Sequence, residues 1–152
     1  MSESVYRKTR KKAAERNSEL NSAENAQDYV YIERTRLLKI ENNETIPHPE
    51  EVSQMMEVYD APQLGNYYCT QQCPIGKGGS LLIYDNLSHI SVALMTALHS
   101  LKKVEDGVYR ILEDGVVSES EQPEFRKILE TLEKIAFSAD SLKLWAQSNG
   151  IA

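Results

Sequence analysis

The sequence lacks a long hydrophobic run, which argues against a protein that spans a membrane. No apolar stretch among the 152 residues approaches the roughly 18 that a span needs, and the N-terminus has no signal-peptide core. The chain has little cysteine, and two cysteines in an acidic chain of this kind favour a reducing compartment. We therefore expect a cytoplasmic protein with no membrane partner.

The familiar signatures of enzymes are also missing. There is no nucleophile elbow, zinc-protease motif or Gly-rich dinucleotide loop, and PIGKGGS at residues 74–80 lacks the ending of a phosphate-binding loop. Cys69 and Cys73 lie four residues apart, but two ligands do not make a tetrahedral zinc site, and the three histidines are scattered. We expect no enzyme, no metal site and no cofactor.

An excess of positive charge, the usual sign of a nucleic-acid-binding protein, is absent as well. The chain has 17 Lys and Arg against 23 Asp and Glu, a formal net charge of −6. Residues 1–66 hold nine basic and twelve acidic residues, so they are acidic too. Any binding to DNA must therefore come from a local basic face rather than from global attraction.

The length and the glycine distribution predict two parts. A chain of 152 residues is enough for one ordinary domain or two small ones. Residues 74–80 contain a Pro, three Gly and a Ser in seven positions, which indicates a break. We predict an all-α protein with a domain at 1–73, a linker at 74–84 and a helical hairpin at 85–152.

Residues 22–42 are predicted to form two short helices with a tight corner between them. Ser22 is expected to cap the first helix, and Glu33 the second. The helical spacing of the apolar residues gives the inward-facing positions as Ala26, Val30, Ile32, Leu37 and Ile40. The outward positions of the second helix are then Arg34, Thr35, Arg36 and Lys39. Arg and Lys reach phosphates and guanine edges, and Thr reaches phosphates or a thymine methyl, so this face suits a DNA major groove.

The run ERTRLLKIEN followed by IPHPEEVSQMMEVYDAPQL resembles the helix-turn-helix domain of the XRE/Cro–phage repressor (lambda-repressor-like) family of bacterial transcription regulators. The resemblance covers roughly Tyr6 to Tyr68. In that family the recognition helix ends in a similar run, matched here by residues 39–42, and a helix that begins at a proline follows. The resemblance implies a five-helix domain, double-stranded DNA as the partner, and dimers on paired half-sites.

Three positions depart from the family pattern. The family usually has Gln where Ala23 stands, a small residue where Gln27 stands, and Gly where Tyr31 stands. Gly reaches a positive φ at low cost, whereas Tyr adopts that conformation at a penalty. These departures and the acidic balance leave a rival hypothesis open. In it, a degenerate helix-turn-helix no longer binds DNA and serves protein–protein assembly.

The segment Val5–Ser18 is a further candidate for DNA contact. It reads VYRKTRKKAAERNS and carries five basic residues between Arg7 and Lys12. One interpretation is a solvated helix face. The other is a cluster along the DNA backbone that adds sequence-independent affinity. The DNA-binding residues we predict are Arg34, Thr35, Arg36, Lys39, Arg7, Lys8, Lys11, Lys12 and Ser22.

The last third of the chain carries two heptad-like seams of apolar residues. The first is Leu87, Ile90, Leu94, Ala97, Leu101, Val104, Val108 and Ile111, and the second is Phe125, Ile128, Leu132, Ile135, Ala139, Leu142 and Ala146. Two such seams joined by a short turn predict an antiparallel hairpin, with a capping box at Ser118 and Glu121. Further apolar residues flank the seams: Val92, Leu98, Leu112, Leu129, Leu144 and Trp145. They indicate another surface to cover, against the first domain or a second copy, and we expect a homodimer through the hairpin.

Overall fold

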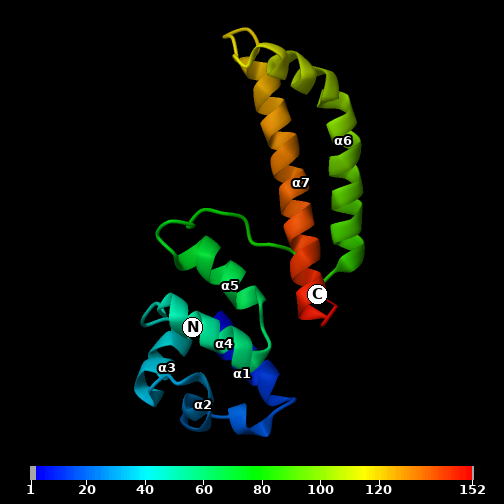
Figure 1. The fold of residues 1–152 in the computed structure, drawn as a ribbon. Coiled ribbons are helices and arrows are strands. Elements are labelled where there is room, and N and C mark those ends of the chain that lie inside the picture. The colour runs from blue at the N-terminus through cyan, green and yellow to red at the C-terminus, as the bar shows by residue number, and fades with distance from the viewer. Residues whose placement is uncertain (1–2, 152) are drawn as a thin grey trace. The chain divides into compact units, whose positions relative to one another are not determined.

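The computed structural model describes residues 3–151, apart from the side chains of Leu112 and Asp114. These residues form seven α-helices and no strand, as predicted for an all-α protein (Figure 1). The helices are α1 (Val5–Ala14), α2 (Ala23–Val30), α3 (Arg34–Glu41), α4 (Pro49–Tyr59), α5 (Gln63–Tyr67), α6 (Leu87–Asp114) and α7 (Gln122–Ser148). A 3₁₀ turn at Ser18–Leu20 precedes α2, and a π-helical turn at Tyr68–Gln72 follows α5. Within this described part, no helix has both the length and the apolar character that crossing a bilayer requires.

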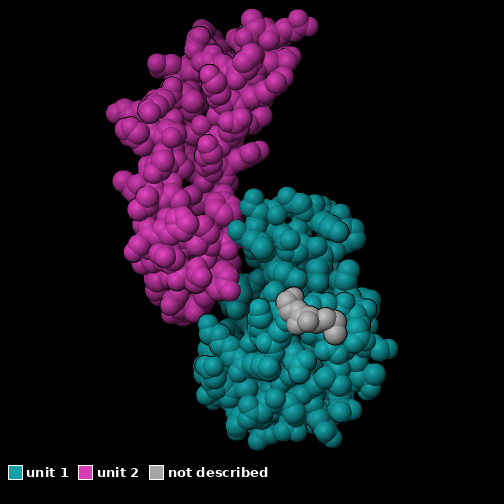
Figure 2. Space-filling model, turned by 180° about the vertical axis from the view of Figure 1, so that it is seen from behind, with its two compact units in different colours: residues 1–81 teal, residues 82–152 magenta. Residues whose placement is uncertain are grey.

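The chain divides into two compact units (Figure 2). The N-terminal unit comprises residues 1–81, and the hairpin unit comprises residues 82–152. The boundary falls inside the glycine-containing segment 74–84. The first part of that segment folds back onto the N-terminal unit, where the Gly78 N–H donates to the Thr70 carbonyl at 3.0 Å. The second part belongs to the hairpin unit, where the Ile83 N–H donates to Ser141 Oγ at 3.2 Å.

The N-terminal unit is built around one core to which α1 to α5 all contribute. The residues at its centre share very low exposure and are Tyr6, Leu20, Ala26, Val30, Leu37, Ile40, Met55, Tyr59 and Leu64. The inward positions predicted for residues 22–42 are all among the buried residues of this core. Five helices of five to eleven residues each bury one face here, so their stability depends on this shared packing.

The corner between α2 and α3 forms as the local sequence predicts. Ser22 Oγ accepts the Asn25 N–H at 3.1 Å and caps α2. Tyr31 ends α2 in the left-handed conformation, with φ of 54°, and its side chain is 83% exposed. Buried Val30 and Ile32 flank it. The chain therefore turns sharply while both neighbours of Tyr31 stay in the core.

In the hairpin unit, α6 and α7 pack side by side and antiparallel along most of their length (Figure 1). Asn86 begins α6 by accepting the His89 N–H at 2.9 Å, and Gly115 ends it with φ of 70°. Gly107 is buried where the helices approach, because the Glu124 side chain of α7 lies over it. Arg110 of α6 binds the same carboxylate at 2.7 Å, so an ion pair joins the two helices at this end of the hairpin.

The inner face of α7 differs from the predicted seam. Leu132, assigned to the seam, is 44% exposed, and Leu87 at the start of the other seam is also exposed. Thr131, Ser138 and Ser141 are buried instead. Thr131 and Ser138 satisfy their hydroxyls by donating to the carbonyls of residues 127 and 134, each at 2.8 Å. With their hydroxyls bonded inside the helix, small polar residues can face α6, and the larger Leu132 turns outward.

The start of α7 also differs from the prediction. The helix begins at Gln122, and the capping box expected at Ser118 is only half formed. The Glu121 carboxylate accepts the Ser118 N–H at 2.8 Å and also its hydroxyl at 2.5 Å. Pro123 explains the late start, since proline is tolerated in the first turn of a helix and not in its interior.

Candidate nucleic-acid interface

The exposed face of α3 carries the residues predicted to contact DNA. Leu37 and Ile40 bury the inner side of the helix, so Thr35 and Lys39, four residues apart, point directly away from the core. Arg34 is exposed beside them in the first turn. Arg36 is half-buried on the flank nearest α4. Of the four predicted groove-side residues, three are therefore freely presented to solvent.

Glu33 caps α3, as its position predicts. Its carboxylate accepts the N–H groups of Thr35 and Arg36 at 3.0 and 3.1 Å. These bonds, first that of Thr35, lower the pKa of Glu33, so the group stays charged. A second brace comes from Gln27 of α2, whose side-chain oxygen accepts the Arg34 N–H at 3.1 Å. The two acceptors orient the first turn of α3 from outside the helix.

Arg36 is held by an acidic partner rather than standing free. Its guanidinium binds both carboxylate oxygens of Glu51 in the first turn of α4, with Nη2 and Oε2 2.7 Å apart and Nε against Oε1. Glu51 also accepts the His48 N–H at 2.6 Å. Burial raises the pKa of Glu51, but the bonds from Arg36 and His48 outweigh it and hold the pKa below its usual range. Arg36 thus joins α3 to α4 at the edge of the face.

A shallow hollow of about 610 Å³ lies on this side of the N-terminal unit. Its lining combines outward residues of α3 with the loop that follows: Glu33, Thr35, Arg36, Lys39, Glu44 and Thr45. The two glutamates bring negative charge to a surface on which Lys39 supplies a positive one. The face is therefore mixed in charge, with its cations concentrated on α3.

The most buried charges of the unit lie directly behind this face. Arg10 of α1 and Glu41 of α3 form a bidentate ion pair of 2.5 and 2.9 Å, and both side chains are almost fully buried. Arg10 also donates to the carbonyls of Leu20 and Asn21 at 2.8 and 2.9 Å. The hydrogen bond to Glu41 raises the pKa of Arg10 above its ordinary value. This network fixes α3 against α1 and the turn before α2.

Arg10, one of the five basic residues between Arg7 and Lys12, therefore faces inward and was not among the predicted DNA-binding residues. The sequence contained a signal for this arrangement. Arg10 lies between Tyr6 and Ala13 on the apolar stripe of α1, and Glu41 directly follows buried Ile40. Two opposite charges on inward-facing stripes indicate a buried pair, because a charge in a core needs a partner.

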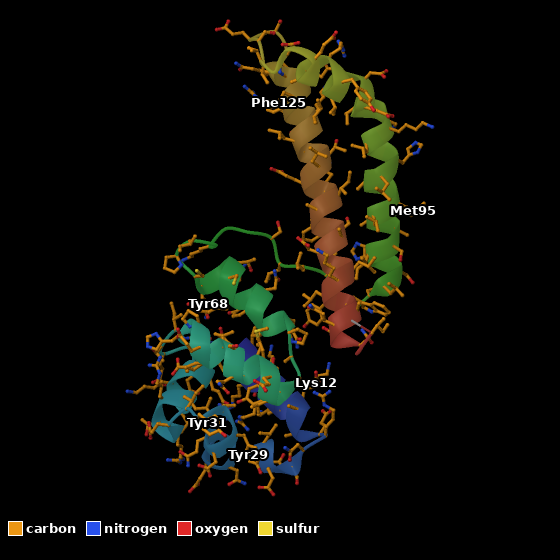
Figure 3. The ribbon with its side chains drawn as sticks, in the orientation of Figure 1. Lys12, Tyr29, Tyr31, Tyr68, Met95 and Phe125 are labelled. Carbon is orange, nitrogen blue, oxygen red and sulfur yellow. The ribbon has the colours of Figure 1, made fainter. Side chains whose placement is uncertain are left out.

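The remaining basic residues of α1 divide into two sets. Arg7 donates to the Asn42 side-chain oxygen at 3.5 Å, which places it beside the C-terminal end of α3. Arg7 and Lys11 share Glu3, at 3.6 and 2.5 Å, and the bond from Lys11 lowers the pKa of Glu3. Lys8 and Lys12 each lie two positions after an inward-facing residue, which is a rotation of about 200° around the helix. Both lysines are therefore exposed and point away from the core (Figure 3 labels Lys12). Arg7 is the member that the structure brings next to α3.

Ser22 and Ala23 stand at the opening of α2. The Ser22 hydroxyl accepts a backbone N–H and remains exposed, so it can still donate outward. Ala23 is buried and presents no polar group. Tyr29 and Tyr31 are exposed at the other end of the same helix (Figure 3). This end of α2 therefore offers aromatic surface beside the corner.

No metal centre is found within residues 3–151, where no group of three or more His, Cys, Asp or Glu side chains converges. Both cysteines are free thiols, with Cys69 exposed and Cys73 half-buried. Compared with known protein families, curated proteins and solved structures, the chain matches none of them.

Proposed function

We propose that the protein is a DNA-binding transcription regulator in which α2 and α3 act as a helix-turn-helix. The observation that carries this proposal is the face of α3. Thr35 and Lys39 point outward, Arg34 is exposed beside them, and the opposite side of the helix is locked into the core. A short helix fixed from behind and basic in front suits insertion into a major groove. No catalytic role is assigned to any residue.

In this proposal the residues have different tasks. Thr35 and Lys39 reach base edges or phosphates in the groove, and Arg34 reaches the flanking backbone. Arg36 acts as a positioning residue, since Glu51 holds its guanidinium in place. Backbone contacts come from Arg7, Lys8, Lys11, Lys12 and the N-terminus of α2 at Ser22. Two copies joined through their hairpin units present two α3 helices to paired half-sites.

The test is binding of the full-length protein to duplex DNA, followed by fluorescence anisotropy at several salt concentrations. Lys39→Ala and Arg34→Ala are each expected to weaken binding about tenfold and to reduce the salt slope by about one if the side chain contacts a phosphate. Lys143→Ala is the matched control, because Lys143 is an exposed lysine on α7. Equal effects of all three substitutions would contradict a specific role for α3.

One observation favours the rival function, protein–protein assembly without DNA. The surface around α3 also carries Glu33, Glu44 and Glu51, and Glu51 neutralises Arg36. Absence of DNA binding at every salt concentration would support this rival, because the helix-turn-helix would then serve only as a scaffold.

A further inference from the structure

Three exposed leucines of the hairpin unit lie on one side of it, whereas Val92 and Met95, also exposed, lie elsewhere around α6. Leu98 directly follows buried Ala97 on α6, and on α7 Leu129 and Leu132 directly follow buried Ile128 and Thr131. One residue further along a helix is a turn of roughly 100°. Because the helices run antiparallel, this rotation points Leu98 of α6 and the two leucines of α7 toward the same side of the helix pair.

A hollow of about 450 Å³ lies along α6 on this side. Its lining comes from about three successive turns of α6 and consists of Leu98, Leu101, Lys102, Glu105, Val108 and Tyr109. Leu98 is 44% exposed and Tyr109 is 68% exposed. We call this surface the α6 face. The side chains of Leu98 and Tyr109 are therefore accessible to a partner.

The charges on and around the α6 face indicate which kind of partner can bind there. Residues 82–152 hold seven Lys and Arg and eleven Asp and Glu, so the unit as a whole repels anions and also repels a second copy. The lining of the hollow carries one lysine and one glutamate and is neutral. A neutral apolar face on an acidic unit disfavours DNA or an anionic membrane as the occupant. It is the place where two acidic copies can meet without repulsion.

The sequence of α6 allows its exposed residues to pair with those of a second, antiparallel copy of α6. When two α6 helices lie antiparallel about a two-fold axis between residues 102 and 105, Lys102 of each faces Glu105 of the other. The same register sets Leu98, four residues before Lys102, opposite Tyr109, four residues after Glu105. One arrangement therefore satisfies the charged pair and the apolar pair together.

We propose that the α6 face is the contact between two copies of this chain, with Lys102 against Glu105 and Leu98 against Tyr109 across the axis. The inference specifies the dimer on which the proposed function rests. It requires no DNA, so it is tested separately.

The experiment uses charge exchange in the full-length protein, with mass measured by light scattering and affinity by sedimentation equilibrium. Wild type should have twice the 17.2 kDa of one chain. Lys102→Glu alone and Glu105→Lys alone each set like charges together twice per dimer and should weaken association at least about tenfold. An equal mixture of the two variants pairs opposite charges again and should restore the dimer.

Lys103→Glu and Asp106→Lys are the matched controls, because both residues are exposed and lie one position further round α6. They should leave association unchanged, and circular dichroism should show that every variant keeps its helices. A monomeric wild type, or single variants that remain fully dimeric, would overturn the proposal. A mixture that stays monomeric would also overturn it and leave the α6 face to a different protein. If the protein binds DNA but fails this test, the proposed function stands and the α6 contact is wrong. If the protein dimerises as described but does not bind DNA, the α6 contact stands and the proposed function is wrong.

Discussion

Arg10 of α1 and Glu41 of α3 are joined by two side-chain hydrogen bonds inside the core of the N-terminal unit. Burying both charges costs desolvation energy, which the pair offsets only while both partners are present. The gain is positional, because Arg10 also binds two carbonyls in the turn before α2. The helix that we propose to enter DNA is thus oriented by a charge network from behind.

Removing one partner of this pair should destabilise the N-terminal unit strongly. Glu41→Ala leaves the Arg10 guanidinium buried without its carboxylate, and we expect a loss of about 3–5 kcal/mol in the free energy of unfolding. Urea unfolding followed by circular dichroism measures this loss, while fluorescence of the single tryptophan, Trp145, reports the hairpin unit separately. Arg10→Met combined with Glu41→Leu is the control and should cost much less. A cost below about 1 kcal/mol for Glu41→Ala would show that the pair is not desolvated.

Tyr31 adopts a positive φ that glycine reaches without strain. Its side chain is mostly exposed, so Tyr31→Gly loses little packing and should raise the free energy of unfolding by about 1 kcal/mol. Tyr29→Gly is the matched control, because Tyr29 lies inside α2, where glycine should lower stability by about the same amount. The same urea experiment measures both variants. If both substitutions lowered the free energy of unfolding, the claim that Tyr31 is strained would be wrong.

The ion pair between Arg36 and Glu51 predicts a dependence of stability on pH. The pKa of Glu51 is lower in the folded protein than the ordinary glutamate value of about 4.3. Its contribution is therefore fully present above about pH 4.3 and is lost as the pH falls through the lower folded pKa. Stability of the wild type should fall more steeply below about pH 4.3 than that of Glu51→Gln. Glu57→Gln, at an exposed position of α4, should behave as wild type. Identical slopes for wild type and Glu51→Gln would contradict this role of Glu51.

Gly107 offers a test in the hairpin unit. A Cβ at this position would lie 2.6 Å from Glu124 Oε1, which is the flexible end of a side chain and can move. Alanine favours a helix interior over glycine by about 1 kcal/mol, whereas the exposed ion pair between Arg110 and Glu124 contributes less. Gly107→Ala should therefore raise the midpoint of unfolding followed by Trp145 fluorescence. A lowered midpoint would mean that the carboxylate cannot be displaced.

Much of the local structure could be predicted from the sequence because its causes are local. The cap at Ser22, the corner at Tyr31 and the cap at Glu33 each depend on residues within one turn. Proline at the start of α4 acts in the same way. The helix class and the inward residues of α2 and α3 followed from apolar spacing for the same reason.

The parts that could not be predicted depend on what packs against a residue. Both Thr131 and Leu132 lie within one turn of Ile128, and the approach of α6 decides which of them is buried. Likewise, an ion pair between residues 10 and 41 requires knowledge of how α1 crosses α3. At the candidate interface, the prediction placed Arg36 outward but gave no sign that Glu51 would hold it.

We propose that the N-terminal unit recognises a DNA sequence through α3. The most direct measurement is selection of bound duplexes from a random library at near-physiological salt, with the full-length protein. We expect an enriched motif with half-sites about 10–10.5 base pairs apart or a multiple of that, and loss of enrichment in Arg34→Ala combined with Lys39→Ala. No enrichment, together with weak binding that vanishes as salt rises, would contradict it.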